Sequence, residues 1–368
     1  VKLRGSYEWQ TGNKLDGSNS KINSYELGLT TTLTFPRVLF PTFSKRDMNF
    51  PASTTFRLYA DQMNRARFFK LLAFGGDASY EFQPTATSHH SITPFKLTFN
   101  LLQHTTHEFD SITNVNKALK KSLQNQFIPA MNYTYTYDDS PITSRRNHLW
   151  WQASVTQAGL VLDGIYALAG KKFNKEDKEL LGNPFAQFIK GTAEIRYNYA
   201  LGHKQYLVGR LMAGAIYSYG NARTSPYNEQ FYIGGANSIG PGRYYQNSDN
   251  NKYAYIDRTG DLKFEANLEY RFPILGDLHG ATFLDSGNIW LIRNDPDRPG
   301  GQLKWGSFLK DLALGTGFGL RYDLTFIVIR FDVGIGLHLP YDTGKKGYYN
   351  IPKFKDGMGY HFAIGYPF

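Results

Sequence analysis

Residues 261–272 alternate between apolar and polar side chains without a break. The apolar side chains are Leu262, Phe264, Ala266, Leu268, Tyr270 and Phe272, and the polar ones are Asp261, Lys263, Glu265, Asn267, Glu269 and Arg271. A period of two residues is that of an extended strand with two different faces. The charged face cannot lie in a dry core, because each unpaired buried charge costs several kcal/mol. A water-filled lumen on one side and lipid on the other satisfy both faces.

The same alternation recurs along the whole chain, so strands are expected throughout. The predicted strands are 1–10, 25–35, 54–62, 66–82, 93–101, 127–137, 147–157, 187–199, 205–217, 261–272, 278–290, 312–322, 326–339 and 358–368. Many are close to the ~9–11 residues that a tilted membrane strand needs. Since only closure removes sheet edges in lipid, the expected fold class is all-β, an antiparallel transmembrane β-barrel with about 14 strands.

Composition narrows the class of protein further. None of the 368 residues is Cys, which excludes disulfide scaffolds, cysteine-ligated zinc and cysteine nucleophiles. No uninterrupted apolar run approaches the ~18–20 residues of a membrane-spanning helix. The net charge of +10 suits a charged lumen, solvated loops or an anionic lipid surface. Nucleic acid is not expected as a partner, because no basic run stands beside a known binding motif.

Residues 158–181 break the alternation. Leu160, Leu162, Ile165 and Leu168 recur at helical spacing and a charged stretch follows, which predicts one short amphipathic helix in a loop or plug. We favour a helix packed within its loop over the alternative, a contact with the membrane surface or with a partner.

The sequence predicts no enzyme, cofactor or metal site. The glycine-rich run 234–242 lacks the Lys-Ser/Thr ending of a phosphate loop and is expected to be a tight loop at a barrel rim. His104 and His107 would point to opposite faces if both lay on a strand, which argues against a metal site. No Ser-His-acid set is recognisable from its spacing.

Three charged residues share inward parity on neighbouring strands, namely Glu269, Asp285 and Arg321. A ladder of carboxylates and arginine could hold an inserted loop through charge-assisted hydrogen bonds. The same residues could equally be ordinary lining of the lumen, and alternation alone does not choose between the two.

Several motifs in the last ~140 residues resemble one family. They are the run Glu229 to Ile239 (EQFYIGGANSI), Leu268-Glu269, Phe283-x-Asp285-x-Gly287, Gly317-x-Gly319-x-Arg321 and the C-terminal Phe362-x-Ile364-Gly365-Tyr366-Pro367-Phe368. In this order they resemble the outer-membrane assembly superfamily of BamA/TamA-like surface-antigen barrels. The phrases GGANSI and GDLHGATFLDSGNIWL are most similar to the TamA-like lipoprotein branch (TamL).

The resemblance implies roles for three groups of residues. The loop-6 entrance would be Gly234, Gly235, Gly240, Pro241 and Gly242; the lumenal residues that anchor this loop would be Glu269, Phe283, Asp285, Gly287 and Arg321; the seam and C-terminal signal would be Phe362, Ile364, Gly365, Tyr366 and Phe368. One departure is clear, because Ile239 runs directly into Gly240 without the family's Arg-Gly-aromatic tip.

The resemblance also implies an architecture and a function. Residues 1–368 would form the C-terminal barrel domain of a sixteen-stranded protein whose first strands and periplasmic POTRA modules are absent from this sequence. Such a barrel lies in the bacterial outer membrane and inserts outer-membrane proteins, or supports envelope translocation, by templating strands at a weak seam between its first and last strands.

The partners expected from the family are outer-membrane lipids, unfolded outer-membrane protein clients and a TamB-like protein of the inner membrane or periplasm. A passive pore or plugged transporter is the main alternative. A barrel phospholipase is a weaker alternative.

Overall fold

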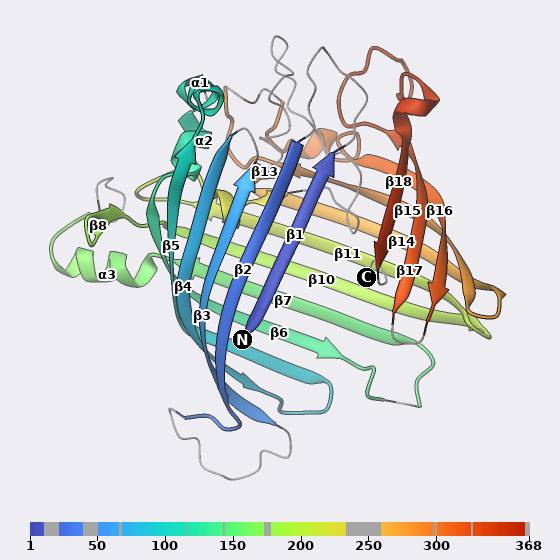
Figure 1. Ribbon diagram of the computed structural model, residues 1–368, viewed down its shortest axis with the longest axis horizontal. Coiled ribbons are helices and arrows are strands. Elements are labelled where there is room, and N and C mark those ends of the chain that lie inside the picture. The colour runs from blue at the N-terminus through green and yellow to red at the C-terminus, as the bar shows by residue number, and fades with distance from the viewer. Residues whose placement is uncertain are drawn as a thin grey trace. The chain divides into compact units, whose positions relative to one another are not determined.

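The computed structural model describes residues 1–10, 22–39, 51–65, 68–115, 117–142, 144–172, 178–232, 259–296, 298, 300–324 and 327–364. Fourteen strands form one antiparallel sheet, in the order β1-β2-β3-β4-β5-β6-β7-β10-β11-β14-β15-β16-β17-β18 (Figure 1). Their bounds are Lys2–Gln10, Ile22–Phe35, Ala52–Arg65, Phe69–Phe82, Ser88–Thr105, Gln126–Asp138, His148–Ala158, Phe188–Gly202, Gln205–Ser218, Leu262–Leu275, Leu278–Trp290, Ala313–Asp323, Val328–His338 and Met358–Ile364.

Short elements lie in the connections between these strands. They are α1 (His107–Val115), α2 (Lys117–Ser122), α3 (Leu160–Leu168), β8 (Glu179–Leu180), β9 (Asn183–Pro184), η1 (Tyr227–Glu229), β12 (Phe231–Tyr232), β13 (Thr259–Gly260), η3 (Trp305–Ser307) and η4 (Phe354–Gly357). A search of the described residues for a helix long and apolar enough to cross a membrane finds none.

Each of the fourteen predicted segments overlaps one strand of the large sheet, so the predicted all-β antiparallel fold class and the strand number are confirmed. His104 lies near the end of β5 and His107 is the first residue of α1, so the two histidines do not share a strand. Helix α1 itself was not predicted. Helix α1 packs through Phe109, whose ring centroid lies 5.2 Å from that of Phe69, a tertiary contact that strand alternation does not indicate.

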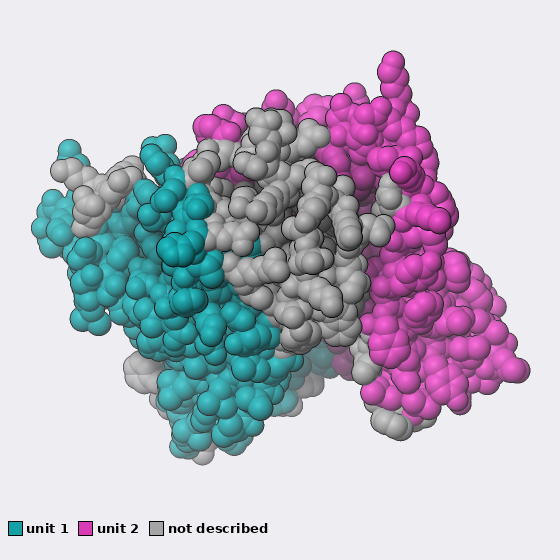
Figure 2. Space-filling model, turned by 45° about the horizontal axis from the view of Figure 1, so that its top comes forward, with its two compact units in different colours: residues 1–135, 154–191, 216–230 teal, residues 136–153, 192–215, 231–368 magenta. Residues whose placement is uncertain are grey.

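The chain divides into two compact units, which are described separately (Figure 2). The first comprises residues 1–135, 154–191 and 216–230. In this unit Leu27, Leu58 and Phe95 are exposed, while Asp77 and Asn100 are buried. Such a distribution is the reverse of that in a soluble protein, and it is what a lipid-facing outer surface requires.

The second unit comprises residues 136–153, 192–215 and 231–368. In its strands β14 to β17, exposed apolar side chains again alternate with buried charged ones. The exposed side chains include Leu268, Leu284, Phe318, Leu320 and Phe331, and the buried ones include Glu265, Glu269, Arg321, Arg330 and Asp332. The alternation seen in the sequence therefore sorts charges to one face of the sheet and apolar side chains to the other.

Helix α3 confirms the helix predicted within residues 158–181, but its apolar side chains do not pack as we favoured. Val161, Ile165 and Leu168 are exposed, whereas Asp163 is fully buried. The helix is thus held through its polar residue and presents its apolar residues outward.

Candidate functional site

The registers of β14, β15, β16 and β17 bring inward-facing residues together at adjacent levels of the sheet. Glu269 pairs with Phe283, Phe283 with Gly317, and Gly319 with Asp332. Residues that pair directly across antiparallel strands point to the same face. Motifs that are far apart in the sequence therefore meet on the inward face of these four strands, which we call the inward wall. They include Phe283-x-Asp285-x-Gly287 and Gly317-x-Gly319-x-Arg321.

Arg321 occupies the centre of this wall and is only 1% exposed. Its guanidinium bonds Oδ1 of Asp332 through Nη1, and its Nη2 lies 3.6 Å from Oε1 of Glu269. Arg271 Nε lies 2.8 Å from the same Glu269 oxygen, and Arg330 Nε lies 3.3 Å from Asp332 Oδ2. We call these five residues the inward network, in which three guanidinium groups share two carboxylates.

Glycines in β16 make room for the inward network. A Cβ atom at Gly319 would overlap Asp332 Oδ1 and Arg321 Nη1, and one at Gly317 would overlap the ring of Phe283 and the carbonyl oxygen of Val333. Atoms cannot approach so closely in a packed structure. The glycines of Gly317-x-Gly319-x-Arg321 are thus required by the space that the ion pair and the ring occupy.

Asp285 belongs to a neighbouring cluster rather than to the inward network. Asn267 Nδ2 donates a hydrogen bond of 2.8 Å to Asp285 Oδ1, and Arg210 Nη1 donates to Asn267 Oδ1 at 3.1 Å. Arg210 in β11 also bonds Glu194 of β10 and Glu265 of β14, at 2.8 and 2.9 Å. Sequence reasoning grouped Asp285 with Glu269 and Arg321. In the described part of the chain, however, the side chain that donates a hydrogen bond to Asp285 is the amide of Asn267 and not an arginine.

The two ends of the predicted loop 6 are fixed to the second unit. Phe231 in β12 pairs with Gly260 in β13 and is buried, and its ring fills the space beside Gly214 where a Cβ atom would lie. Lys263 Nζ donates to the carbonyl oxygen of Tyr232 at 3.1 Å. The predicted entrance residues themselves lie outside the described residues; they are Gly234, Gly235, Gly240, Pro241 and Gly242.

The predicted seam is described only in part. Phe362 lies in β18, pairs with Phe331 of β17 and is 69% exposed. Ile364 is the last residue of β18 and pairs with Ile329. The remaining seam predictions, Gly365, Tyr366 and Phe368, lie outside the described residues.

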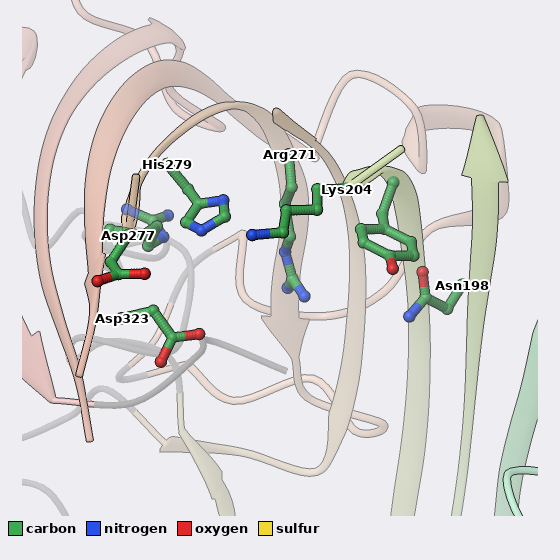
Figure 3. A pocket seen from close by; sticks show the side chains of 8 residues that line it. Asn198, Lys204, Arg271, Asp277, His279 and Asp323 are labelled. Atoms are coloured by element: carbon green, nitrogen blue, oxygen red, sulfur yellow. The ribbon is translucent and has the colours of Figure 1, made fainter. Parts of the chain in front are cut away.

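A cavity of about 500 Å³ opens where β14 and β15 meet at the turn formed by Gly276 and Asp277 (Figure 3). It is lined by Asn198, Lys204, Tyr206, Arg271, Asp277, His279, Arg321 and Asp323. Lys204 extends toward His279 across this space in Figure 3. Arg271 and Arg321 line the cavity and also belong to the inward network, so the network reaches this end of the strands.

Sequence reasoning proposed Glu269, Phe283, Asp285, Gly287 and Arg321 as residues that anchor loop 6, and this role stays a prediction. It did not single out the polar residues that the structure places beside them, namely Glu194, Arg210, Glu265, Asn267, Arg271, Arg330 and Asp332. All of these lie on predicted strands. Their inward parity was the available signal, but parity alone does not tell which inward residues on different strands lie at the same level. That depends on register.

The Omp85 superfamily domain matches residues 9–368 of this chain. Among solved structures, the chain is similar to BamA from Haemophilus ducreyi lacking POTRA domains 1–3, with a TM-score of 0.59 and 13% sequence identity over 94% of this chain and 64% of that chain. It is also similar to CdiB from Acinetobacter baumannii, with a TM-score of 0.50 and 13% identity over 94% of this chain and 50% of that one.

The chain therefore spans less than two thirds of either solved structure. At such identities the likeness concerns the fold alone. No curated protein matches the chain.

Proposed function

The chain belongs to the Omp85 superfamily of integral outer-membrane barrels, and from this premise we propose that it inserts or exports other proteins by offering the edge of β18 to an incoming client strand. The clients would be unfolded outer-membrane proteins or secreted proteins. No covalent step is involved in adding a strand, so the proposed function needs neither a catalytic residue nor a cofactor.

The observation that carries this proposal is the position of β18 at one end of the sheet order. Within the described strands it pairs with β17 alone, over the seven residues from Met358 to Ile364. An edge strand presents unpaired backbone N–H and C=O groups, which another extended chain can use. The exposed side chains of Tyr360 and Phe362 add an apolar surface to that edge.

We assign the inward network a supporting role. Buried charge pairs that span β14, β16 and β17 resist sliding of these strands, because a shifted register would leave charges unpaired. The wall beside β18 would then stay in register while β18 itself exchanges partners. Asp285, whose Oδ1 is bonded by Asn267, would hold the segment that enters at Tyr232.

We further propose that the protein belongs to the TamL branch of the superfamily. The resemblance to the TamL branch favours a role in translocation and assembly with a TamB-like partner, together with POTRA modules in the whole protein. The phrases GGANSI and GDLHGATFLDSGNIWL support this branch.

Cysteine mapping tests the edge directly, because the chain contains no native cysteine. Phe362→Cys is placed in the full chain in liposomes, an unfolded barrel client with single cysteines along its strands is added, and disulfides are mapped. We expect crosslinks between Phe362→Cys and one client strand in a defined register. Phe331→Cys is the matched control, since Phe331 is the cross-strand partner of Phe362 and its strand is paired on both sides.

Equal crosslinking at the two positions would contradict addition at the β18 edge. A protein that conducts ions through liposomes without accelerating client insertion would instead support a passive pore. Hydrolysis of lipid esters by the purified chain would favour the phospholipase alternative.

A further inference from the structure

Helix α3 exposes several apolar side chains. Leu160, Val161 and Ile165 are exposed, and Leu168 is 92% exposed. The spacing of 161, 165 and 168 places these three side chains on one side of the helix. Soluble proteins rarely expose several large apolar side chains side by side. This side of α3 is therefore expected to contact an apolar environment.

The opposite side of α3 is fixed by a buried polar cluster, which we call the α3 root. Lys178 Nζ lies 2.7 Å from Asp163 Oδ1, and Gln187 Nε2 donates to Asp163 Oδ2 at 2.5 Å. Asn221 donates to the carbonyl oxygens of Lys178 and Phe185, at 2.7 and 3.0 Å. Because both oxygens of Asp163 are satisfied, the root determines which side of the helix faces outward.

Two lysines follow the helix directly. The helix ends at Leu168, and Gly170 adopts a φ of +83°, the left-handed conformation that ends many helices. Lys171 and Lys172 come next and both are exposed, and Lys171 Nζ lies 5.0 Å from the centre of the Tyr166 ring. Basic residues beside an apolar helix side are typical of helices that lie in a lipid headgroup region.

The strands that α3 connects also expose apolar side chains near the connection. The connection leaves β7 at Ala158 and returns in β10 at Phe188. Val155 near the end of β7 and Ile189 at the start of β10 are both exposed apolar residues. In Figure 1, α3 projects beyond β5 and away from the strands of the first unit.

The lengths of the connections indicate the leaflet. One end of the strands carries mostly short turns, such as 203–204 and 276–277, although 36–51 is longer. The other end carries mostly long connections, such as 106–125 and 159–187, although 66–68 is short. Outer-membrane barrels have short periplasmic turns and longer extracellular loops. Helix α3 therefore lies at the extracellular end.

We propose that α3 is an interfacial helix whose exposed apolar side inserts into the outer leaflet beside the barrel, with Lys171 and Lys172 on anionic headgroups. The occupant of this surface is lipid rather than a partner protein. Such a helix would fix the height of the 159–187 connection relative to the membrane, a role separate from strand addition at β18.

A single-cysteine probe measures the location of α3. Leu168→Cys is labelled with an environment-sensitive dye, and the full chain is reconstituted in phosphatidylcholine vesicles with and without phosphatidylglycerol. We expect the dye to lose most of its fluorescence to a quencher on the lipid acyl chains and little to iodide in the water. Ser140→Cys, in an exposed turn at the opposite end of the strands, should show the reverse order.

A second variant tests the charge. Lys171→Gln/Lys172→Gln in the Leu168→Cys background should remove the part of the acyl-chain quenching that depends on phosphatidylglycerol and leave the part seen in phosphatidylcholine alone. A Leu168→Cys dye that iodide quenches as fully as the dye at Ser140→Cys would overturn the proposal. So would protection that develops only when a second protein is added to the vesicles.

Discussion

The inward network and the α3 root both bury charges, but they are built differently. The root pairs one carboxylate with one ammonium group, and its members come from one connection and the segment near Asn221. The inward network shares two carboxylates among three guanidinium groups drawn from β14, β16 and β17. A closed pair fixes one local element, whereas a shared network ties together strands that are distant in the sequence.

Removing Arg321, the central cation of the inward network, should have the largest effect on stability of the changes considered. We expect Arg321→Ala to lower the free energy of unfolding by about 3–5 kcal/mol, because Glu269 and Asp332 would keep their buried charges without this partner. Urea unfolding in detergent micelles measures the loss. Arg4→Ala is the control, since Arg4 is 65% exposed and its bridge to Asp61 should contribute at most about 1 kcal/mol. Similar losses in both variants would show that the network is not buried as described.

Breaking the α3 root should have a local effect of about 3 kcal/mol. In Asp163→Ala the buried Lys178 loses its carboxylate, so we expect faster trypsin cleavage after Lys171 and Lys172 while the melting temperature of the sheet stays the same. Asp163→Leu/Lys178→Met removes both charges and should restore most of the resistance. If Asp163→Ala lowers the melting temperature of the whole sheet, the root is not a local device.

Asp285 should matter more for the proposed activity than for stability. Asp285→Ala loses the hydrogen bond from Asn267, which costs about 1 kcal/mol, but we expect a clear loss of client insertion. Insertion rate and unfolding free energy are measured on the same preparation. The control is Ser286→Ala, the next residue, whose side chain lies on the opposite face of β15. Unchanged insertion by Asp285→Ala would remove its role in holding loop 6.

An ion pair in the turn after β6 should have the smallest effect and depend on pH. Burial raises the pKa of Asp139, but hydrogen bonds from the Leu149 N–H and from Arg145 outweigh burial and hold this pKa below its ordinary value. Its contribution to stability is therefore present above the unfolded pKa of about 3.9 and is lost as the pH falls through the folded pKa. The difference in unfolding midpoint between the native chain and Asp139→Asn should shrink on acidification from neutral pH; a constant difference would contradict this.

The sequence predicted the strands well but the charge partners poorly. Glu269 and Arg321 were correctly placed on the inward face, because parity follows from the position of a residue within its own strand. Asp332 and Arg330 were not recognised as their partners, because the level at which two strands pair depends on register shifts such as the one between Leu314 and Gly315. Helix α1 was missed for a similar reason, since its anchor Phe109 packs on Phe69 of another element.

The alternation of side chains by itself determined that this chain forms a membrane-type antiparallel sheet, because a period of two and a charged face are local properties of each strand. Only the tertiary structure decided which charges meet, and that α3 turns its apolar residues outward. Both outcomes depend on contacts between distant segments. Which charges meet depends on the register of the successive strands β14, β15, β16 and β17, and the orientation of α3 depends on the buried bond between Asp163 and Lys178. Helical spacing is the same whether the apolar side is covered or free, so no local pattern could distinguish them.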